Sequence, residues 1–136
     1  MEVSNEKLEE IAEQLDTGFK VFLNAKSLEI VSFPDADKFN EIDPIWKHEI
    51  DKVYNDFENY IEIEGLDSSG SFKIMESFIR TITDKNIIAR LTQAIEGHKP
   101  FANFKYQIDN SPANRHTWFE FKQNQLIEYV RKQLNF

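Results

Sequence analysis

The spacing of apolar residues changes along this chain, and that change constrains the fold more than any other feature. Two short runs rich in branched and aromatic residues, 19–23 and 28–33, are separated by a polar Asn-Ala-Lys-Ser stretch. This pattern predicts a β-hairpin with a four-residue loop. Beyond Gly70 the apolar residues recur only at helical spacing. The sequence therefore predicts an α+β protein, with a small antiparallel sheet near the amino end and a helical carboxyl half.

Helices are expected on both sides of the hairpin in the amino half. Ser4 is placed to cap a helix that ends near residue 16, and Asp43 followed by Pro44 is typical of the start of another. The apolar face of this second helix is marked by Ile45, Trp46, Ile50, Val53, Tyr54 and Phe57. The run 60–64, which ends before Gly65, predicts a third strand that extends the hairpin sheet.

Four helices are expected in the carboxyl half. The first carries an apolar stripe from residue 72 to 82, and the second runs from an Asp84 cap to Gly97. A third follows Pro100, and Ser111 with Pro112 opens a terminal helix that reaches about residue 134. The side chains expected to anchor the packing are Trp46, Trp118 and Phe121.

Length and composition limit the classes of protein that this chain can be. With 136 residues, twelve Phe, four Tyr and two Trp, it can bury a core without covalent staples, and we predict a single domain over 1–136. The sequence has no cysteine, which excludes disulfides, thiolate zinc sites, iron–sulfur clusters and cysteine nucleophiles. Only four glycines are present, which leaves little room for phosphate-binding loops.

Charge divides the chain into an acidic and a basic region. Residues 1–70 hold 18 Asp and Glu against 6 Lys, a balance of -12. Residues 71–136 hold 10 Lys and Arg against 6 Asp and Glu, a balance of +4. The overall charge of -8 disfavours a general nucleic-acid binder, whereas the division leaves a basic surface possible in the carboxyl half.

The amino terminus does not have the features of a secretory signal, because no basic segment is followed by an apolar stretch. No apolar run approaches the ~18 residues that span a bilayer. We therefore expect a cytoplasmic protein that does not associate with membranes.

The carboxyl half resembles an uncharacterised bacterial protein family. The resemblance covers about residues 72–134, and it rests on four motifs: Phe72-x-x-Met75-x-x-Phe78-Ile79, Ala94-Ile95-x-Gly97, Phe101-x-x-Phe104-Lys105 and Trp118-Phe119-x-Phe121. That family has no assigned reaction, cofactor or catalytic residue, so the resemblance implies no function. Its members often carry a basic pair between the two phenylalanines of the third motif, where this chain has Ala102 and Asn103. This difference weakens any inherited expectation of anion binding there.

Two motifs that would imply a cofactor or metal are incomplete. Gly65 and Gly70 have the separation of the P-loop glycines, but the lysine that the motif requires for the phosphates is missing. A capped turn into the next helix is the better interpretation. His48 and Asp51 share a helix face, yet zinc sites need three or four ligands. We predict neither a cofactor nor a metal site.

The segment 97–122 is the strongest candidate for anion binding. Its possible binding residues are Lys99, Lys105, Arg115, Lys122, His98 and His116. They alternate with aromatic residues, and positive charge combined with aromatic surface binds single-stranded nucleic acid. Against this, Phe101 and Phe104 share a helical face that we assign to the core, which leaves Tyr106 and one of Phe119 or Phe121 as exposed stacking groups.

A catalytic alternative uses His98 and His116, which flank the helix after Pro100 and could form an acid–base pair with Glu120 in a small hydrolase. No local motif supports a nucleophile, so we assign no catalytic residue.

The sequence as a whole predicts a non-catalytic protein–protein interaction or regulatory module. Its partner would be another protein that docks on the acidic amino half or on exposed aromatic surface. Nucleic-acid or other anion binding through 97–122 is the first alternative and the hydrolase is the second. The oligomeric state is left open.

Overall fold

The computed structural model describes residues 1–135. The chain forms two compact units. The first, here the sheet unit, comprises Met1–Gly65 and the residues from Leu126 onward. The second, here the helical unit, comprises Leu66–Gln125. The long helix α6 (Pro112–Gln133) contributes its first part to the helical unit and its last turns to the sheet unit.

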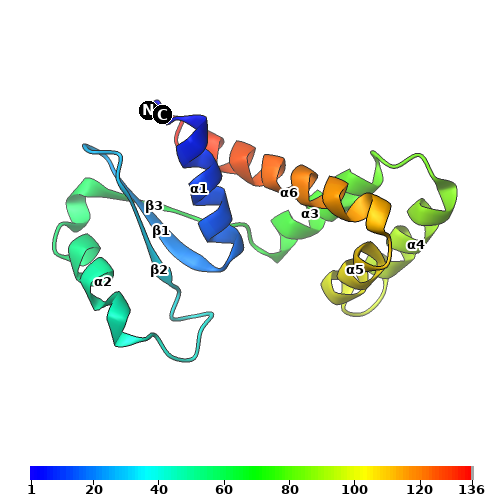
Figure 1. Cartoon of the computed structure of the whole chain (residues 1–136), viewed down its shortest axis with the longest axis horizontal. Helices are drawn as coiled ribbons and strands as arrows, with labels where there is room; N and C mark the ends of the chain where they lie inside the picture. The colour runs from blue at the N-terminus through cyan, green and yellow to red at the C-terminus, as the bar shows by residue number, and fades with distance from the viewer. Residues whose placement is uncertain (136) are drawn as a thin grey trace. The chain divides into compact units, whose positions relative to one another are not determined.

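The sheet has three antiparallel strands, β1 (Phe19–Asn24), β2 (Ile30–Pro34) and β3 (Tyr60–Ile63), in the order β2-β1-β3. The central strand β1 pairs with both neighbours, so the predicted third strand does extend the hairpin (Figure 1). The α+β class expected from the sequence is thereby confirmed.

The hairpin turn is longer than predicted. The second strand begins at Ile30 because Leu28 has a φ of 62°, in the left-handed region that an extended strand does not allow. The side chain of Asn24 organises the turn, since its Oδ1 accepts hydrogen bonds from the backbone N–H groups of Lys26 and Ser27. Such an Asx turn stabilises a local bend without strand pairing.

One face of the sheet packs against α1 (Asn5–Asp16) and the last turns of α6. Ser4 caps α1 as predicted, because its side chain accepts a hydrogen bond from the Lys7 N–H. Alternation along β1 directs Val21 and Leu23 to this face. The buried core here consists of Leu8, Ile11, Leu15, Val21, Leu23, Ile63, Val130 and Leu134.

The opposite face packs against α2 (Lys47–Tyr54), which follows the 3-10 turn η1 (Pro44–Trp46). Figure 1 shows α1 and α2 on the two sides of the sheet. The buried residues on this side are Phe22, Val31, Phe33 and Val53, with Trp46, Ile50 and Tyr60 packed around them. Trp46 is therefore the packing anchor that we expected.

The predicted apolar face of α2 is partly wrong. Ile45, Tyr54 and Phe57 are 73%, 49% and 51% exposed, respectively. Phe57 is not in the helix at all, because α2 ends at Tyr54 and Phe57 begins the 3-10 turn η2 (Phe57–Asn59). Helical spacing alone assigned these residues to the core, but spacing does not show where a helix ends or which side chains pack on it.

The helical unit contains α3 (Ser68–Ile79), α4 (Lys85–Glu96), α5 (Pro100–Asp109) and the first part of α6. Its buried core is Met75, Phe78, Ile79, Leu91, Ile95, Phe104 and Ile108. Trp118 and Phe121 pack against this core, which confirms their predicted role as anchors. Phe101 is an exception to the predicted core face of α5, since it is 43% exposed.

Carboxylates cap two of these helices. Asp67 accepts from the Gly70 N–H, so the Gly65–Gly70 segment is the capped turn predicted in place of a P-loop. Asp84 accepts from both Asn86 and Ile87 at the start of α4. Each bond satisfies one N–H that a helix terminus otherwise leaves without a partner.

The turn between α4 and α5 differs from expectation in one respect. Gly97 ends α4 as predicted, but its φ is -95°, and the left-handed residue of this turn is Lys99 with a φ of 52°. The side-chain amide of Asn103 donates to the carbonyl oxygen of His98 and so ties the turn to α5. The conformation that glycine usually supplies at a helix end falls here on a residue with a Cβ.

Candidate functional site

The cations predicted to bind anions are only partly brought together. Lys105 and Arg115 meet at one carboxylate, because the Lys105 Nζ lies 3.2 Å and the Arg115 Nε 3.7 Å from oxygens of Asp109. The Arg115 guanidinium also lies 5.8 Å from the centroid of the Phe119 ring, within cation–π range. These two cations are thus compensated within the helical unit, which reduces their attraction for a phosphate.

The predicted acid–base histidines are both on the surface. The His116 Nε2 lies 2.8 Å from a Glu120 oxygen, and the His116 side chain is 82% exposed. His98 is also exposed and lies in the turn before α5, whereas His116 lies on α6. His116 and Glu120 thus form a surface i, i+4 pair, and His98 is a second exposed imidazole.

Lys99 and Lys122, the remaining candidates for anion binding, belong to different parts of the segment. Lys99 is exposed and precedes the first turn of α5, whereas Lys122 is half-buried on α6. Of the predicted anion-binding cations, only Lys105 and Arg115 share a printed contact, at Asp109, and the binding role of the set stays a prediction.

No metal centre is present among the described residues: within 1–135, no three potential ligands are grouped closely enough to hold an ion. Asp51, one of the two ligands considered from the sequence, instead pairs with Lys47 one turn earlier. In the same part of the chain, no polar or charged residue is buried. None of its helices is long and apolar enough to cross a membrane.

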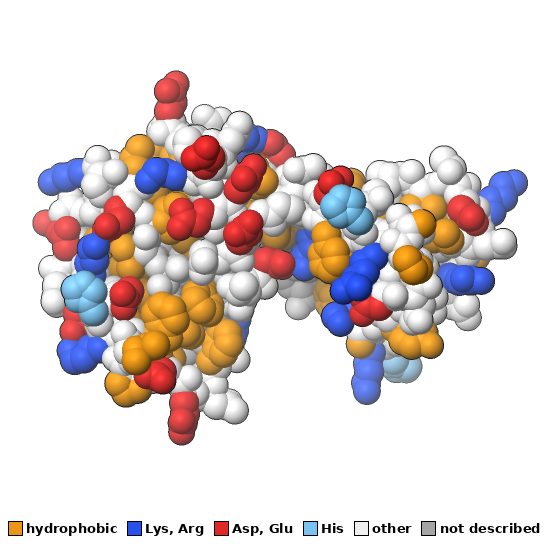
Figure 2. Space-filling view, viewed as in Figure 1, with side chains coloured by type: hydrophobic (Ala, Val, Ile, Leu, Met, Phe, Trp, Pro, Cys, Tyr) orange, Lys and Arg blue, Asp and Glu red, His pale blue; other side chains and the backbone are white. Residues whose placement is uncertain are grey.

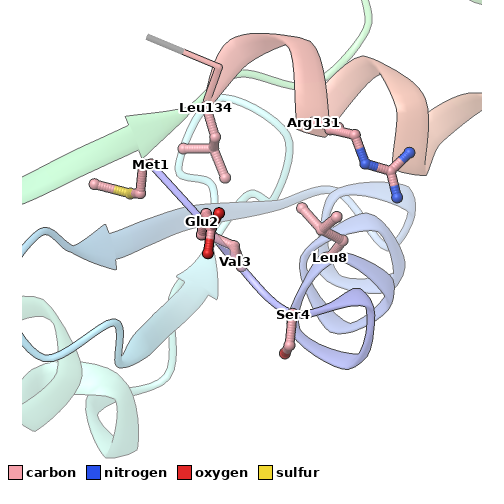
Figure 3. Close-up of a pocket in the computed structure, with 7 residues that line it drawn as sticks. All are labelled: Met1, Glu2, Val3, Ser4, Leu8, Arg131 and Leu134. Carbon is pink, nitrogen blue, oxygen red and sulfur yellow. The ribbon is translucent and has the colours of Figure 1, made fainter.

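A shallow depression of about 470 Å³ lies between the amino-terminal residues and the end of α6 in the sheet unit (Figure 3). Arg131 is the cation of its lining, and its side chain already contacts Glu128 and donates to Asn5 over 2.9 Å. Met1, Val3, Leu8 and Leu134 supply its apolar wall. The lining also holds the carboxylate of Glu2, so the depression has one charged side chain of each sign, and its cation is already engaged by neighbouring side chains.

An exposed apolar surface lies at the other end of the sheet unit. Here it is called the Phe39 patch, and it consists of Phe19, Phe39, Ile45 and Trp46. The Phe19 ring packs edge-on against Phe39 and Trp46, with centroid distances of 6.1 and 5.6 Å. Phe39 remains 37% exposed, and Ile45 beside Trp46 is 73% exposed.

The sequence around the Phe39 patch explains its local structure. Asp35 folds the loop after β2, because its Oδ1 accepts from the Asp37 N–H and its carbonyl oxygen accepts from the Phe39 N–H. Gly18 has a φ of 88°, and a Cβ added to it would lie 3.6 Å from the Phe39 ring. Asp43 accepts from the Ile45 N–H and so fixes the start of η1.

Carboxylates surround the Phe39 patch. The loop between β2 and η1 carries Asp35, Asp37, Glu41 and Asp43, with Lys38 as its cation. Within residues 1–135, no cation lies at ion-pair distance from Asp37 or Glu41, and both are exposed. Figure 2 shows an apolar patch with acidic side chains at its edges where Figure 1 places this loop and the start of α2.

Tyr54 and Phe57 form a second exposed aromatic group near the end of α2. Their rings stack at 5.5 Å, and both rings contact Phe22 with centroid distances of 6.1 and 6.4 Å. They cover the ring of Phe22, which is 1% exposed, and this contact accounts for their position.

The Phe39 patch was not predicted from the sequence. Phe39 stands alone in a polar loop, and Ile45 has the spacing of a core residue, so neither gave a surface signal. The one available signal was the presence of a large apolar residue amid loop carboxylates.

The fold and this surface together define a small α+β protein whose acidic unit presents an apolar patch. A model described as "Uncharacterised protein family (UPF0158)" matches residues 3–135. The chain therefore belongs to this family, as the carboxyl-half motifs suggested. It is similar to a UPF0158 protein of Pseudomonas aeruginosa, with 24% identity over 124 residues that cover 90% of this chain and 76% of that relative. No solved structure matches the chain.

Proposed function

We propose that this protein is a non-catalytic interaction module that binds another protein through the Phe39 patch. The observation that supports this proposal is the 73% exposure of Ile45, which directly precedes Trp46 in a segment that carries four carboxylates. The 37% exposed Phe39 is joined to Trp46 through the ring of Phe19. Singly exposed apolar residues are common, whereas a group of them with polar residues at its edge is typical of a protein–protein interaction site. Interface cores are enriched in aromatic residues and surrounded by polar rims, which is the arrangement found here.

Trp46 can contribute a large share of the binding energy at the Phe39 patch. Trp46 is held in place by the core residues around it and by Phe19, so its exposed edge is ordered before a partner arrives. Ordered aromatic side chains lose little conformational entropy on binding and often dominate interface energies. Phe39 and Ile45 then supply the surface that a partner would desolvate.

A capture experiment with substituted full-length chains tests the proposal. Ile45→Ser removes apolar surface from the patch, and Tyr106→Ser is the matched control, because Tyr106 is 65% exposed in the helical unit. Quantitative mass spectrometry of crosslinked complexes should find a partner that is retained by the control and lost by Ile45→Ser. Circular dichroism of both variants should match the unsubstituted chain. Equal recovery of every captured protein by the two variants would contradict the proposal.

We further propose that the protein acts in a bacterial cytoplasm. The similarity to a Pseudomonas aeruginosa protein supports a bacterial source. Fractionation of cells that express the tagged chain tests the location, and recovery in the periplasmic or membrane fraction would overturn it.

A further inference from the structure

We infer that the Phe39 patch binds a short amphipathic segment of another protein, with apolar side chains on one face and Lys or Arg beside them. This inference rests on the proposed function and specifies the chemistry of its partner. It follows from the size of the patch, from the charge around it and from the charge of the rest of the molecule.

The size of the patch favours a short segment. Four side chains form it, and the larger exposed share belongs to Ile45 and Phe39. A standard interface between two folded domains uses about 20–30 residues on each side. One or two apolar side chains of a helix turn or extended segment would cover the patch, as in complexes where an amphipathic helix lies in a groove.

The charge around the patch favours a basic segment. Four carboxylates against Lys38 give residues 35–43 a net charge of -3. The carboxylates of Asp35 and Asp43 accept hydrogen bonds from backbone N–H groups, which do not neutralise their negative charge. Asp37 and Glu41 are exposed and form no ion pair within residues 1–135. Complementary charge accelerates association and suppresses wrong partners, so Lys or Arg should flank the apolar residues of the bound segment.

A second copy of this chain is a weaker candidate for the occupant than a separate basic segment. The helical unit has a balance of only +2, and two of its exposed cations, Lys105 and Arg115, share Asp109. Its other exposed cations have no ion pair among the described residues, but they are spread over α3, α4 and the turn before α5: Lys73, Arg80, Lys85, Arg90 and Lys99. Self-association is therefore an outcome of the test rather than the proposal.

The test uses full-length protein and three fluorescent peptides of about 16 residues, or ~4 helical turns. The first has Leu at i, i+3, i+4 and i+7 with Lys at the other positions. The second replaces Lys by Glu, and the third keeps the composition of the first but scrambles the order, which removes the apolar face. We expect the first peptide to bind with the highest affinity and to shift backbone NMR signals of residues 35–46.

Two double charge reversals in the sheet unit separate the patch from general acidity. Asp37→Lys with Glu41→Lys should weaken binding of the Lys peptide by about tenfold or more, which equals ~1.4 kcal/mol. Glu6→Lys with Glu10→Lys changes the same charge on exposed positions of α1 and should change binding by less than about twofold. Equal weakening by the two reversals, or equal binding of the scrambled peptide, would overturn the inference.

The outcomes also distinguish this inference from the proposed function. A patch-dependent partner that the Lys peptide does not displace would overturn the inference and leave the proposed function standing. A dimer seen by sedimentation and lost in Ile45→Ser, without peptide binding, would replace the peptide segment by a second copy. If Ile45→Ser altered neither capture nor peptide binding, both proposals would fall.

Discussion

The sheet unit and the helical unit contrast in how they use charge and aromatic residues. The sheet unit holds 18 Asp and Glu against 8 Lys and Arg, a balance of -10, and the helical unit holds 6 against 8, a balance of +2. In the helical unit, Lys105 and Arg115, two of the cations predicted to bind anions, both pair with Asp109. In the sheet unit, exposed carboxylates without ion partners lie beside exposed apolar side chains. The contrast shows that a net charge locates a binding surface only when the charges are not already paired.

The aromatic residues repeat this contrast. Phe78 lies at the centre of the helical unit, where its ring contacts those of Phe104, Trp118 and Phe121 at 5.2–6.4 Å. In the sheet unit the Phe19–Phe39–Trp46 group lies at the edge of the fold, and part of it remains in contact with water. The first group holds a core together, and the second is available to a partner.

The largest effect is expected from Phe78→Ala. Phe78 is completely buried, so truncation should lower the free energy of unfolding by about 3–5 kcal/mol. Each unit has one tryptophan, Trp46 or Trp118, so Trp46→Phe and Trp118→Phe backgrounds report urea unfolding of each unit separately. If the chain unfolds as the single domain that we predict, Phe78→Ala should shift both tryptophan transitions to the same lower urea concentration, because α6 belongs to both units.

Phe101→Ala is the control for this substitution, because Phe101 is in the same unit and 43% exposed, and it should cost much less. A shift confined to the Trp118 signal would show that the two units unfold independently, and the single-domain prediction would then be wrong.

A smaller effect is expected at the helix caps. Asp84→Ala removes hydrogen bonds to two N–H groups, at 2.9 and 3.3 Å, and should cost about 1 kcal/mol. Ser4→Ala removes one bond of 3.3 Å and should cost less. The melting temperatures of the two variants compare a cap in the helical unit with a cap in the sheet unit. A larger loss of stability in Ser4→Ala than in Asp84→Ala would contradict the interpretation of the capping geometry.

Pairing at Asp109 predicts a change in nucleic-acid binding. The full chain should show no measurable anisotropy change with a fluorescent single-stranded oligonucleotide at about 0.15 M salt. Asp109→Asn frees Lys105 and Arg115 and should produce weak binding at low salt only. Strong binding by the unsubstituted chain that is lost in Lys105→Glu with Arg115→Glu would favour the nucleic-acid alternative over the interaction module.

The smallest effect is expected at Lys52. The hydrogen bond to Glu29, at 2.6 Å, raises the pKa of the Lys52 ammonium above its ordinary value of 10.5. A raised lysine pKa means that the pair contributes stability below about pH 10.5 and loses it as the pH rises through the folded-state pKa. Lys52→Met should therefore lower the melting temperature slightly at neutral pH and have no effect at the alkaline end.

Lys26→Met is the control for Lys52→Met, because Lys26 is an exposed lysine of the hairpin turn with no ion pair in the described chain. An identical pH dependence in the two variants would mean that the Glu29 pair contributes nothing.

Much of the fold followed from local signals in the sequence. The caps at Ser4 and Asp84 and the strands around the hairpin appeared close to where they were predicted. The errors have local physical causes: Leu28 adopts a left-handed conformation and delays β2, and α2 ends before Phe57. Of the candidate site, only the partial grouping of Lys105 and Arg115 was foreseeable, whereas Asp109 as their shared partner was not.

The sequence by itself determined the α+β class, the positions of the helices and the division of charge, because periodicity, capping and composition are properties of neighbouring residues. Only the tertiary structure decided which apolar residues lie on the surface and which charges are paired. Phe101 and Phe104 lie on the same predicted face of α5, yet Phe104 is 2% exposed and Phe101 is 43% exposed. Exposure depends on which distant side chains pack nearby: Trp46 packs on the core of the sheet unit, whereas its neighbour Ile45 is 73% exposed.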